Sequence, residues 1–297
     1  MVQINTDWSR DETLSDRCYG PNGKKPFGYP LCAEVAMGRA NVLAIDSVMK
    51  TAIFSILIFG STLLVAGLEG ITVELRTNAE KGDAKSQFAL GRIFDVGRGV
   101  KQDYAEAFRW YLKAAEQEHP LAQHMVGEMY RLGQGVAQSD AEAAKWFRRG
   151  AENGESSAQN NLGVIYEYGQ GGAQDFSQAV KWYRKSAEQG NSGGQSNLGA
   201  MYKYGKGVPQ DFSEAVKWYQ RAASQDYGKA QTNLGVMYAT GKGVRLSNIE
   251  AYKWFTLAIK NGDSNGAKNR DFLVKRMRRE EIDQGELQAR NYVKGKS

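Results

Sequence analysis

Apolar and small residues recur along most of this chain with a period of 36, and each period contains two helical patterns. The first pattern places apolar residues on one face of a helix, as in the third period at Ala158, Leu162, Ile165 and Tyr166. The second pattern has the spacing i, i+3, i+4, i+7 and i+8, as in the first period at Ala107, Trp110, Tyr111, Ala114 and Ala115. The pattern therefore predicts five 36-residue helix-turn-helix units over residues 84–263.

Tryptophan and glycine keep the register of the period without an insertion. The tryptophans are Trp110, Trp146, Trp182, Trp218 and Trp254. A glycine lies inside each first helix, where it costs about 1 kcal/mol relative to alanine, at Gly91, Gly127, Gly163, Gly199 and Gly235. Its recurrence indicates that a neighbouring helix approaches too closely for a side chain. A Gly-x-Gly pair such as Gly205 and Gly207 then ends the first helix, because glycine accepts positive φ.

Each second helix begins with a good N-cap residue, followed three positions later by glutamate or glutamine. The caps are Asp103, Ser139, Asp175, Asp211 and Ser247, and the following residues are Glu106, Glu142, Gln178, Glu214 and Glu250. This spacing is typical of a capping box, in which the cap accepts a helix N–H and the glutamate reaches back. The recurring acids are therefore interpreted as caps and not as catalytic carboxylates.

The ends of the array break the period. Residues 71–83 resemble a lone second helix, and residues 264–297 are predicted to form capping helices, which a solenoid needs at its ends. The apolar run 51–68 is marginal for a membrane span. With Met49 and Lys50 before it, residues 49–67 resemble a signal peptide, and residues 1–48 would then be an upstream extension, disordered or not translated. The alternative is a signal anchor, with the repeats outside the cytoplasm.

Composition and charge narrow the function classes. The 39 basic and 33 acidic residues are interspersed, so no strong basic stripe predicts nucleic-acid binding. Both cysteines, Cys18 and Cys32, precede the predicted signal segment. The two histidines, His119 and His124, lack metal-ligand spacing. The Gly-x-Gly turns lie between helices and not after a strand, which argues against a phosphate loop. We therefore expect no catalytic constellation, metal or cofactor.

The repeated residues resemble a known family. The third unit carries the pattern Ala158-Gln159-x-x-Leu162-Gly163-x-x-Tyr166-x-x-Gly169-x-Gly171, followed by Asp175, Ala179, Trp182, Tyr183 and Ala187. This pattern resembles the Sel-one-like repeat (SLR) family, a relative of the tetratricopeptide repeat. The resemblance implies an all-α, right-handed α-solenoid that acts as an adaptor or scaffold. In bacteria such proteins are often exported and serve envelope assembly, signalling or host contact.

The resemblance implies a protein-protein interaction scaffold of the bacterial cell envelope, periplasmic or secreted. The alternative is an enzyme, because some cysteine-rich relatives are described as β-lactamases or penicillin binders. Those relatives carry a cysteine pair in each repeat, whereas no repeat of this chain contains cysteine. We therefore expect a protein or peptide partner, no nucleic acid, and no membrane contact beyond residues 51–68 if they are uncleaved.

Candidate partner-binding residues are those that vary between units or lack a role in folding. Tyr168 and Tyr204 are predicted to be exposed, and exposed tyrosines often anchor interfaces. Asn161, Asn197 and Asn233 share one position at the edge of a buried stripe. They either hold a partner's backbone or bond to the loop of an adjacent unit, and buried polar groups are usually satisfied internally. The same internal role is expected for Gln87, Gln123, Gln159, Gln195 and Gln231.

Overall fold

The computed structural model of the protein describes residues 73–170 and 173–294. They belong to a compact unit that spans Ile71–Ser297. The predicted upstream extension (1–48) and signal segment (49–67), together with the apolar run 51–68, lie outside the described residues. Among the helices that are described, none has both the length and the apolar character needed to cross a bilayer.

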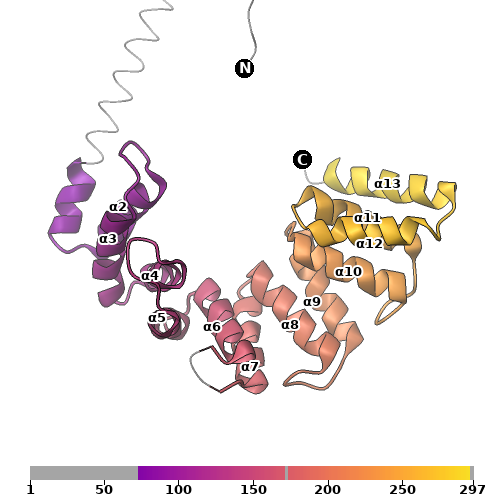
Figure 1. Ribbon diagram of the computed structural model, residues 1–297, viewed down its shortest axis with the longest axis horizontal. Coiled ribbons are helices and arrows are strands. Elements are labelled where there is room, and N and C mark those ends of the chain that lie inside the picture. The colour runs from indigo at the N-terminus through magenta and orange to yellow at the C-terminus, as the bar shows by residue number, and fades with distance from the viewer. Residues whose placement is uncertain (1–72, 171–172, 295–297) are drawn as a thin grey trace, which may run out of the picture. The chain divides into compact units, whose positions relative to one another are not determined.

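The described chain folds into helices that follow one another in pairs (Figure 1). The first helices of units one to five are α2 (Ala84–Val96), α4 (Pro120–Leu132), α6 (Ser156–Tyr168), α8 (Ser192–Tyr204) and α10 (Gly228–Thr240). The second helices are α3 (Tyr104–Glu116), α5 (Asp140–Glu152), α7 (Phe176–Glu188), α9 (Phe212–Ser224) and α11 (Asn248–Lys260). Residues 73–80 are helical before the array, and α12 (Ser264–Val274) and α13 (Arg279–Lys294) follow it. The predicted all-α array of five helix-turn-helix units is confirmed.

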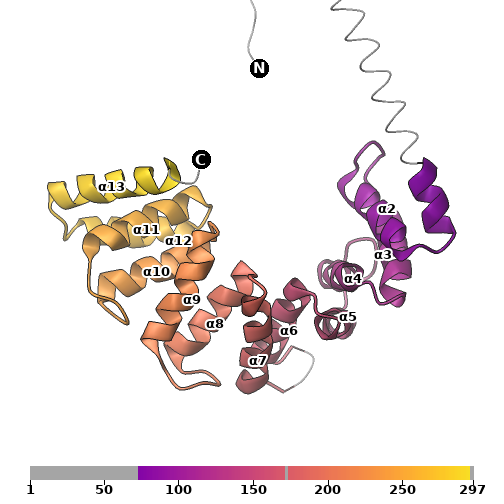
Figure 2. The same ribbon diagram turned by 180° about the vertical axis from the view of Figure 1, so that it is seen from behind.

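The recurring tryptophan joins each unit to the one before it. Trp182 of α7 is 8% exposed and packs with Ala151 of α5 and Leu162 of α6. Trp254 of α11 likewise packs against α9 and α10, and Tyr292 of α13 meets its ring edge-on at 5.3 Å. Neighbouring pairs therefore lie side by side in chain order, as the two opposite views show (Figures 1 and 2).

The glycine inside each first helix faces an aromatic ring of the paired second helix. A Cβ placed on Gly163 would lie 2.6 Å from Cδ1 of Tyr183, well inside van der Waals contact. The other units repeat this approach, with Tyr111, Phe147, Tyr219 and Phe255 against their glycines. The expected close approach is confirmed, and it is made by the ring of the neighbouring helix and not by its backbone.

The capping-box prediction is confirmed for the cap residues and wrong for the residues three positions after them. The cap residues do accept helix N–H groups, as Asp175 does from Gln178 at 2.9 Å. The glutamates, however, do not reach back, because the cap's own N–H already donates to the first helix of its unit; in unit three, Asp175 donates to Tyr166 at 2.9 Å. Glu214 instead pairs with Lys217 at 2.6 Å. Glu106, Glu142 and Glu250 form the same i,i+3 pairs with Arg109, Lys145 and Lys253.

A buried glutamine in every unit links three consecutive elements. Gln159 donates from Nε2 to the carbonyl of Ala151, at the end of the preceding second helix, at 3.2 Å. Its Oε1 accepts from Gln189, 30 residues later, at 2.8 Å. The four other glutamines make the same two bonds, with sequence separations of 8 and 30. The internal role expected of these glutamines is confirmed.

Two turns between units have a non-glycine residue in the left-handed conformation, Glu118 at the end of unit one and Asp226 at the end of unit four, and the first predicts a stabilising substitution. Glu118 has φ 62°, where units two, three and five have Gly154, Gly190 and Gly262. A left-handed conformation costs a non-glycine residue about 1–2 kcal/mol, partly offset by the entropy that glycine loses on folding. We expect Glu118→Gly to raise the free energy of unfolding by up to about 1 kcal/mol, measured by urea denaturation.

The matched control is Glu116→Gly, two residues earlier in the right-handed end of α3. There glycine relieves no strain and should lower stability by up to about 1 kcal/mol. Equal effects of the two substitutions would contradict the role assigned to the left-handed turn.

A second prediction concerns pH, through the cap of α4. The Nδ1 atom of His119 accepts the N–H of Ala122 at 3.3 Å, and its ring stacks on Phe88 at 4.8 Å between centroids. Burial lowers the pKa of His119 below its ordinary value of 6.5. The unfolded chain therefore binds a proton more readily than the folded one, so this contribution to stability is full above about pH 6.5 and is lost as the pH falls.

The expected result is a fall in the free energy of unfolding between about pH 7.5 and pH 5.5 that His119→Asn removes in part. Asparagine caps a helix without titrating in that range. Unfolding curves of both proteins at each pH give the difference directly. A wild-type minus variant difference that does not change with pH would refute the role of His119.

Candidate functional site

Two of the candidate residues, Tyr168 and Tyr204, end the first helices of units three and four. Tyr168 is the last residue of α6 and Tyr204 the last of α8, each directly before a glycine in the left-handed conformation. Their exposed fractions are 65% and 60%, which confirms the exposure expected from the sequence. Two large aromatic side chains at equivalent positions of adjacent units thus face solvent.

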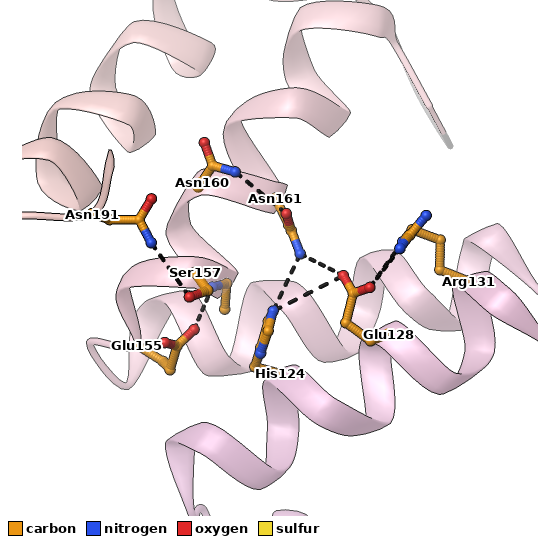
Figure 3. Close-up of polar contacts among 9 residues, drawn as sticks. His124, Glu128, Arg131, Glu155, Ser157, Asn160, Asn161 and Asn191 are labelled. Carbon is orange, nitrogen blue, oxygen red and sulfur yellow. Dashed lines mark hydrogen bonds and ion pairs between the residues drawn. The ribbon is translucent and has the colours of Figure 1, made fainter. Parts of the chain in front are cut away.

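Asn161 lies in a polar network between α4 and α6 (Figure 3). Its Nδ2 donates to Oε1 of Glu128 at 2.7 Å and lies 3.3 Å from Nε2 of His124. The other oxygen of Glu128 binds Arg131 at 2.5 Å, and this bond raises the pKa of the arginine. The network joins the first helices of units two and three through side chains that are all partly buried or at the surface.

Asn197 repeats this geometry one unit later. Its Nδ2 donates to Oδ1 of Asn160 at 2.9 Å, and Asn160 in turn lies 3.4 Å from Oδ1 of Asn161. Both Asn161 and Asn197 thus reach the first helix of the preceding unit, 37 residues earlier. The expectation of a bond to the adjacent unit's loop was wrong, because the shared position faces the neighbouring helix and not the turn.

Asn233, the third candidate of this series, is half-buried in α10. Its side chain makes no hydrogen bond to the part of the chain that the structure describes. Its amide is therefore available at the same helix face on which Asn161 and Asn197 are already engaged. Whether any of the three holds a partner stays a prediction.

Polar residues at the starts of α6 and α8 act as caps, and Figure 3 includes the side chains of Glu155 and Asn191. Glu155 accepts the N–H of Ala158, and Asn191 accepts that of Gly194 at 2.9 Å. Asn191 also donates to Oγ of Ser157 at 3.4 Å. These side chains satisfy helix N–H groups that have no partner within the helix. They are therefore explained by folding.

The position one residue before each exposed tyrosine carries opposite charges in units three and four. Glu167 accepts from the Tyr183 hydroxyl at 2.8 Å and pairs with Lys206, from the loop of the next unit, at 3.6 Å. Lys203, its counterpart in unit four, instead stacks over the ring of Tyr204 at 4.9 Å. Units three and four thus present similar tyrosines in different electrostatic surroundings.

The sequence pointed to part of this surface and missed the rest. It identified the exposed tyrosines and the asparagine series, but not the Glu128 network that fixes Asn161. Glu128 occurs at its repeat position in unit two alone, where the other units have Arg92, Val164, Ala200 and Val236. A one-unit residue of this kind gives no periodic signal. The described residues contain no group of three or more potential metal ligands.

Comparison with known proteins identifies the family of the repeat. The model of the Sel1 repeat family matches residues 84–119, 120–155, 156–191, 192–227 and 228–263. A comparison with curated proteins gives no match.

Three solved structures are among those to which this chain is similar. A Sel1 repeat protein from Oxalobacter formigenes has 33% sequence identity and a TM-score of 0.61, over 64% of this chain and 75% of that one. A protective antigen of uropathogenic Escherichia coli with an SLR fold has 28% identity and a TM-score of 0.40, over 75% and 63%. An immunity protein from Pseudomonas aeruginosa has 18% identity and a TM-score of 0.45, over 68% and 81%.

Proposed function

Because this chain belongs to the Sel1 repeat family, we propose that it is a non-enzymatic scaffold that binds a protein partner on the first helices of units three and four. The observation that carries the proposal is the pair of exposed tyrosines, Tyr168 and Tyr204, at equivalent positions of adjacent units. Tyrosine contributes a large, rigid contact area and a hydroxyl, and it is enriched among residues that dominate binding energy.

The surroundings of the tyrosines fit the same role. The amides of Asn160, Asn161 and Asn197 form a hydrogen-bonded row across α6 and α8. Such a row holds its side chains in fixed orientations, so a partner that bonds to their remaining donors and acceptors does not have to order them. The buried Gln159 and Gln195 of these helices are bonded to other elements of the array, whereas the rings of Tyr168 and Tyr204 face solvent.

The enzymatic alternative has less support. The relatives that suggest it carry cysteine pairs in their repeats, and the repeats of this chain have none. The acids that recur in the units pair with lysine or arginine one helical turn away or cap helices. A hydrolysis assay with a chromogenic β-lactam distinguishes the two functions: turnover above the uncatalysed rate would favour the enzyme.

The test of the surface uses Tyr168→Ala together with Tyr204→Ala. Loss of two anchoring side chains should weaken binding by at least about tenfold, corresponding to roughly 1.4 kcal/mol. The measurement is affinity capture from an envelope extract, followed by titration of the captured partner. The control replaces Phe272 and Leu287 by alanine, since both are exposed apolar residues of the C-terminal helices. If both pairs of substitutions weaken binding equally, or neither does, the proposed surface is wrong.

The location of the scaffold is a separate proposal. The apolar run 51–68 behind Met49 and Lys50 supports export, with cleavage near residue 67 and the repeats in the periplasm or outside the cell. Retention of the run as an anchor would leave the repeats outside the cytoplasm on the inner membrane. Sequencing the mature N-terminus decides between them: a chain that starts near residue 68 supports cleavage, and one that starts before Met49 contradicts it.

A further inference from the structure

The second helix of every unit places one buried aromatic ring against the glycine of the first helix. In units one and three the ring is a tyrosine, and its hydroxyl donates to an acid 16 residues earlier in the paired helix. Tyr111 donates to Asp95 at 3.2 Å and Tyr183 donates to Glu167 at 2.8 Å. Units two and five have phenylalanine at this position, with Arg131 and Ala239 in place of the acid. In these four units, the acid is therefore present where the ring is tyrosine and absent where the ring is phenylalanine.

Unit four breaks this rule. Its ring is Tyr219, which is 0% exposed, and the residue 16 positions earlier is Lys203. The hydroxyl of Tyr219 has no hydrogen-bond partner among the described residues. A buried hydroxyl without an acceptor destabilises the folded state, so unit four carries a destabilising group that units one and three do not have.

The register of the repeat places a second cation, Lys242 of unit five, beside Lys203. Lys206, from the loop of unit four, pairs with Glu167 of unit three and lies 5.1 Å from the centroid of the Phe176 ring. Its counterpart one unit later, Lys242, lies 5.2 Å from the centroid of the Phe212 ring. The two loops therefore pack on the preceding unit in the same register.

The glycines beside these lysines support the same register. A Cβ placed on Gly207 would lie 2.3 Å from the carbonyl oxygen of Phe176, and one placed on Gly243 would lie 2.3 Å from that of Phe212. Lys242 therefore occupies the repeat position of Lys206. Lys203 and Tyr219 likewise occupy the positions of Glu167 and Tyr183. Neither Lys203 nor Lys242 forms an ion pair within the described residues.

We propose that unit four binds a carboxylate of the partner protein, at the place that Glu167 occupies in unit three, between Lys203, Lys242 and the hydroxyl of Tyr219. The inference rests on the proposed function and specifies the chemistry of its partner. Lysine ammonium groups and a tyrosine hydroxyl all donate to a carboxylate, and such charge-assisted bonds are stronger than neutral ones. The stem of Lys203, now over the Tyr204 ring, is the flexible part that moves to admit the ligand.

Tyr219 suits the role of a donor. Burial raises the pKa of its hydroxyl above the ordinary value of 10.0, so the group stays protonated at neutral pH. The exposed ring of Tyr204 borders the same place, since the Lys203 ammonium lies 4.9 Å from its centroid. The carboxylate and the aromatic contact of a partner would therefore be recognised together at the end of α8.

The first experiment compares thermal melting of variants without any ligand. Tyr183→Phe removes a hydrogen bond to a partly buried carboxylate and should lower Tm. Tyr219→Phe removes only an unpartnered hydroxyl and should leave Tm unchanged or raise it. Lys203→Glu rebuilds the arrangement of unit three and should raise Tm. If Tyr219→Phe lowers Tm as much as Tyr183→Phe, the hydroxyl already has a partner and the inference fails.

The second experiment measures binding by chemical-shift perturbation of the backbone amides of units three to five. The probes are hexaglutamate with an amidated C-terminus, hexaglycine with a free C-terminal carboxylate, and hexaglutamine amide as the neutral control. We expect saturable shifts at Lys203, Tyr219 and Lys242 with a carboxylate probe and none with hexaglutamine. Shifts with hexaglutamate identify a side-chain carboxylate, and shifts with hexaglycine alone identify a chain terminus. No shifts with either carboxylate probe would overturn the proposal.

Two variants with the same change in charge distinguish a specific carboxylate site from general electrostatic attraction of the probe. Lys203→Glu should weaken binding of the carboxylate probe by at least about tenfold. Lys229→Glu makes the same change at an exposed residue in the first turn of α10 and should have little effect. Equal weakening by both variants would mean that net charge alone attracts the probe, and the inference would be rejected.

The two proposals can fail separately. If the captured partner binds Lys203→Glu as tightly as wild type but loses affinity for the tyrosine double variant, the carboxylate site is wrong and the scaffold surface stands. If the carboxylate probe binds at unit four while the tyrosine double variant captures the partner normally, the site stands and the tyrosine surface is wrong.

Discussion

Replacing Trp182 by alanine is expected to lower the free energy of unfolding by about 3–5 kcal/mol, the range for a buried aromatic residue whose removal leaves a cavity. Trp182 packs against Ala151 of unit two and Leu162 of its own unit. The substitution therefore removes contacts from a joint between units as well as from one unit. Because each unit of such an array is stabilised mainly by its neighbours, we also expect the unfolding transition to broaden. Urea denaturation followed by circular dichroism measures both effects.

The control for this prediction is Lys185→Ala. The Lys185 ammonium lies 4.5 Å from the centroid of the Trp182 ring, at the exposed side of the helix. Removing it abolishes the cation–π contact, worth about 0.5–1 kcal/mol at an exposed site, and leaves the ring buried. Similar losses in the two variants would show that packing at the joint is not the main source of stability.

Gly207→Ala is expected to cost about 2–4 kcal/mol, through two separate effects. Gly207 has φ 68°, a conformation that alanine adopts with strain. An added Cβ would also lie 2.3 Å from the carbonyl oxygen of Phe176, which is backbone and cannot rotate away. The loop of unit four must then move off α7. Calorimetry gives the loss of stability, and hydrogen exchange should rise at the α7–α8 joint.

Gly99→Ala separates the two effects of the loop substitution. Gly99 holds the same loop position in unit one with φ 77°, and an added Cβ there would meet no atom within 4 Å. This variant should show only the cost of the left-handed conformation, about 1–2 kcal/mol. If Gly99→Ala and Gly207→Ala lower the free energy of unfolding equally, the contact between the loop and the preceding unit does not contribute to stability.

The sequence predicted this fold well, because each unit repeats its own packing rules. The tryptophans, the helix-internal glycines and the buried glutamines recur without an insertion, and all of them proved to contact other elements of the array. Gln159 shows why: a buried amide must find partners, and identical neighbours can supply them only at fixed separations along the chain. Recurrence at 36 residues thus predicted structural roles even where the bonding partner was unknown.

What the sequence could not predict was which atoms meet between units. The cap residue Asp175 has its N–H bonded to Tyr166, so the glutamine three residues after it had no group to reach. Asn161 meets Glu128 and His124 and not a loop, because the rotation between units sets which faces of adjacent first helices oppose each other. The hydroxyl of Tyr219 has no partner in the described part of the chain, although the tyrosines at the same position of units one and three each bond to an acid. The rotation between adjacent units cannot be predicted from the period or from the residue types.

The glutamine bonds have a consequence for how such a chain could change in length. Their separations of 8 and 30 residues are the same at every joint. If recombination between repeated segments of the coding sequence removed residues 156–191, Gln195 would follow Ala151 by eight positions and Asn197 would face His124, as Asn161 does now. The new joint would form from bonds already present in the old ones. Loss or duplication of a whole unit would then alter the spacing between recognition residues without requiring the fold to be built again.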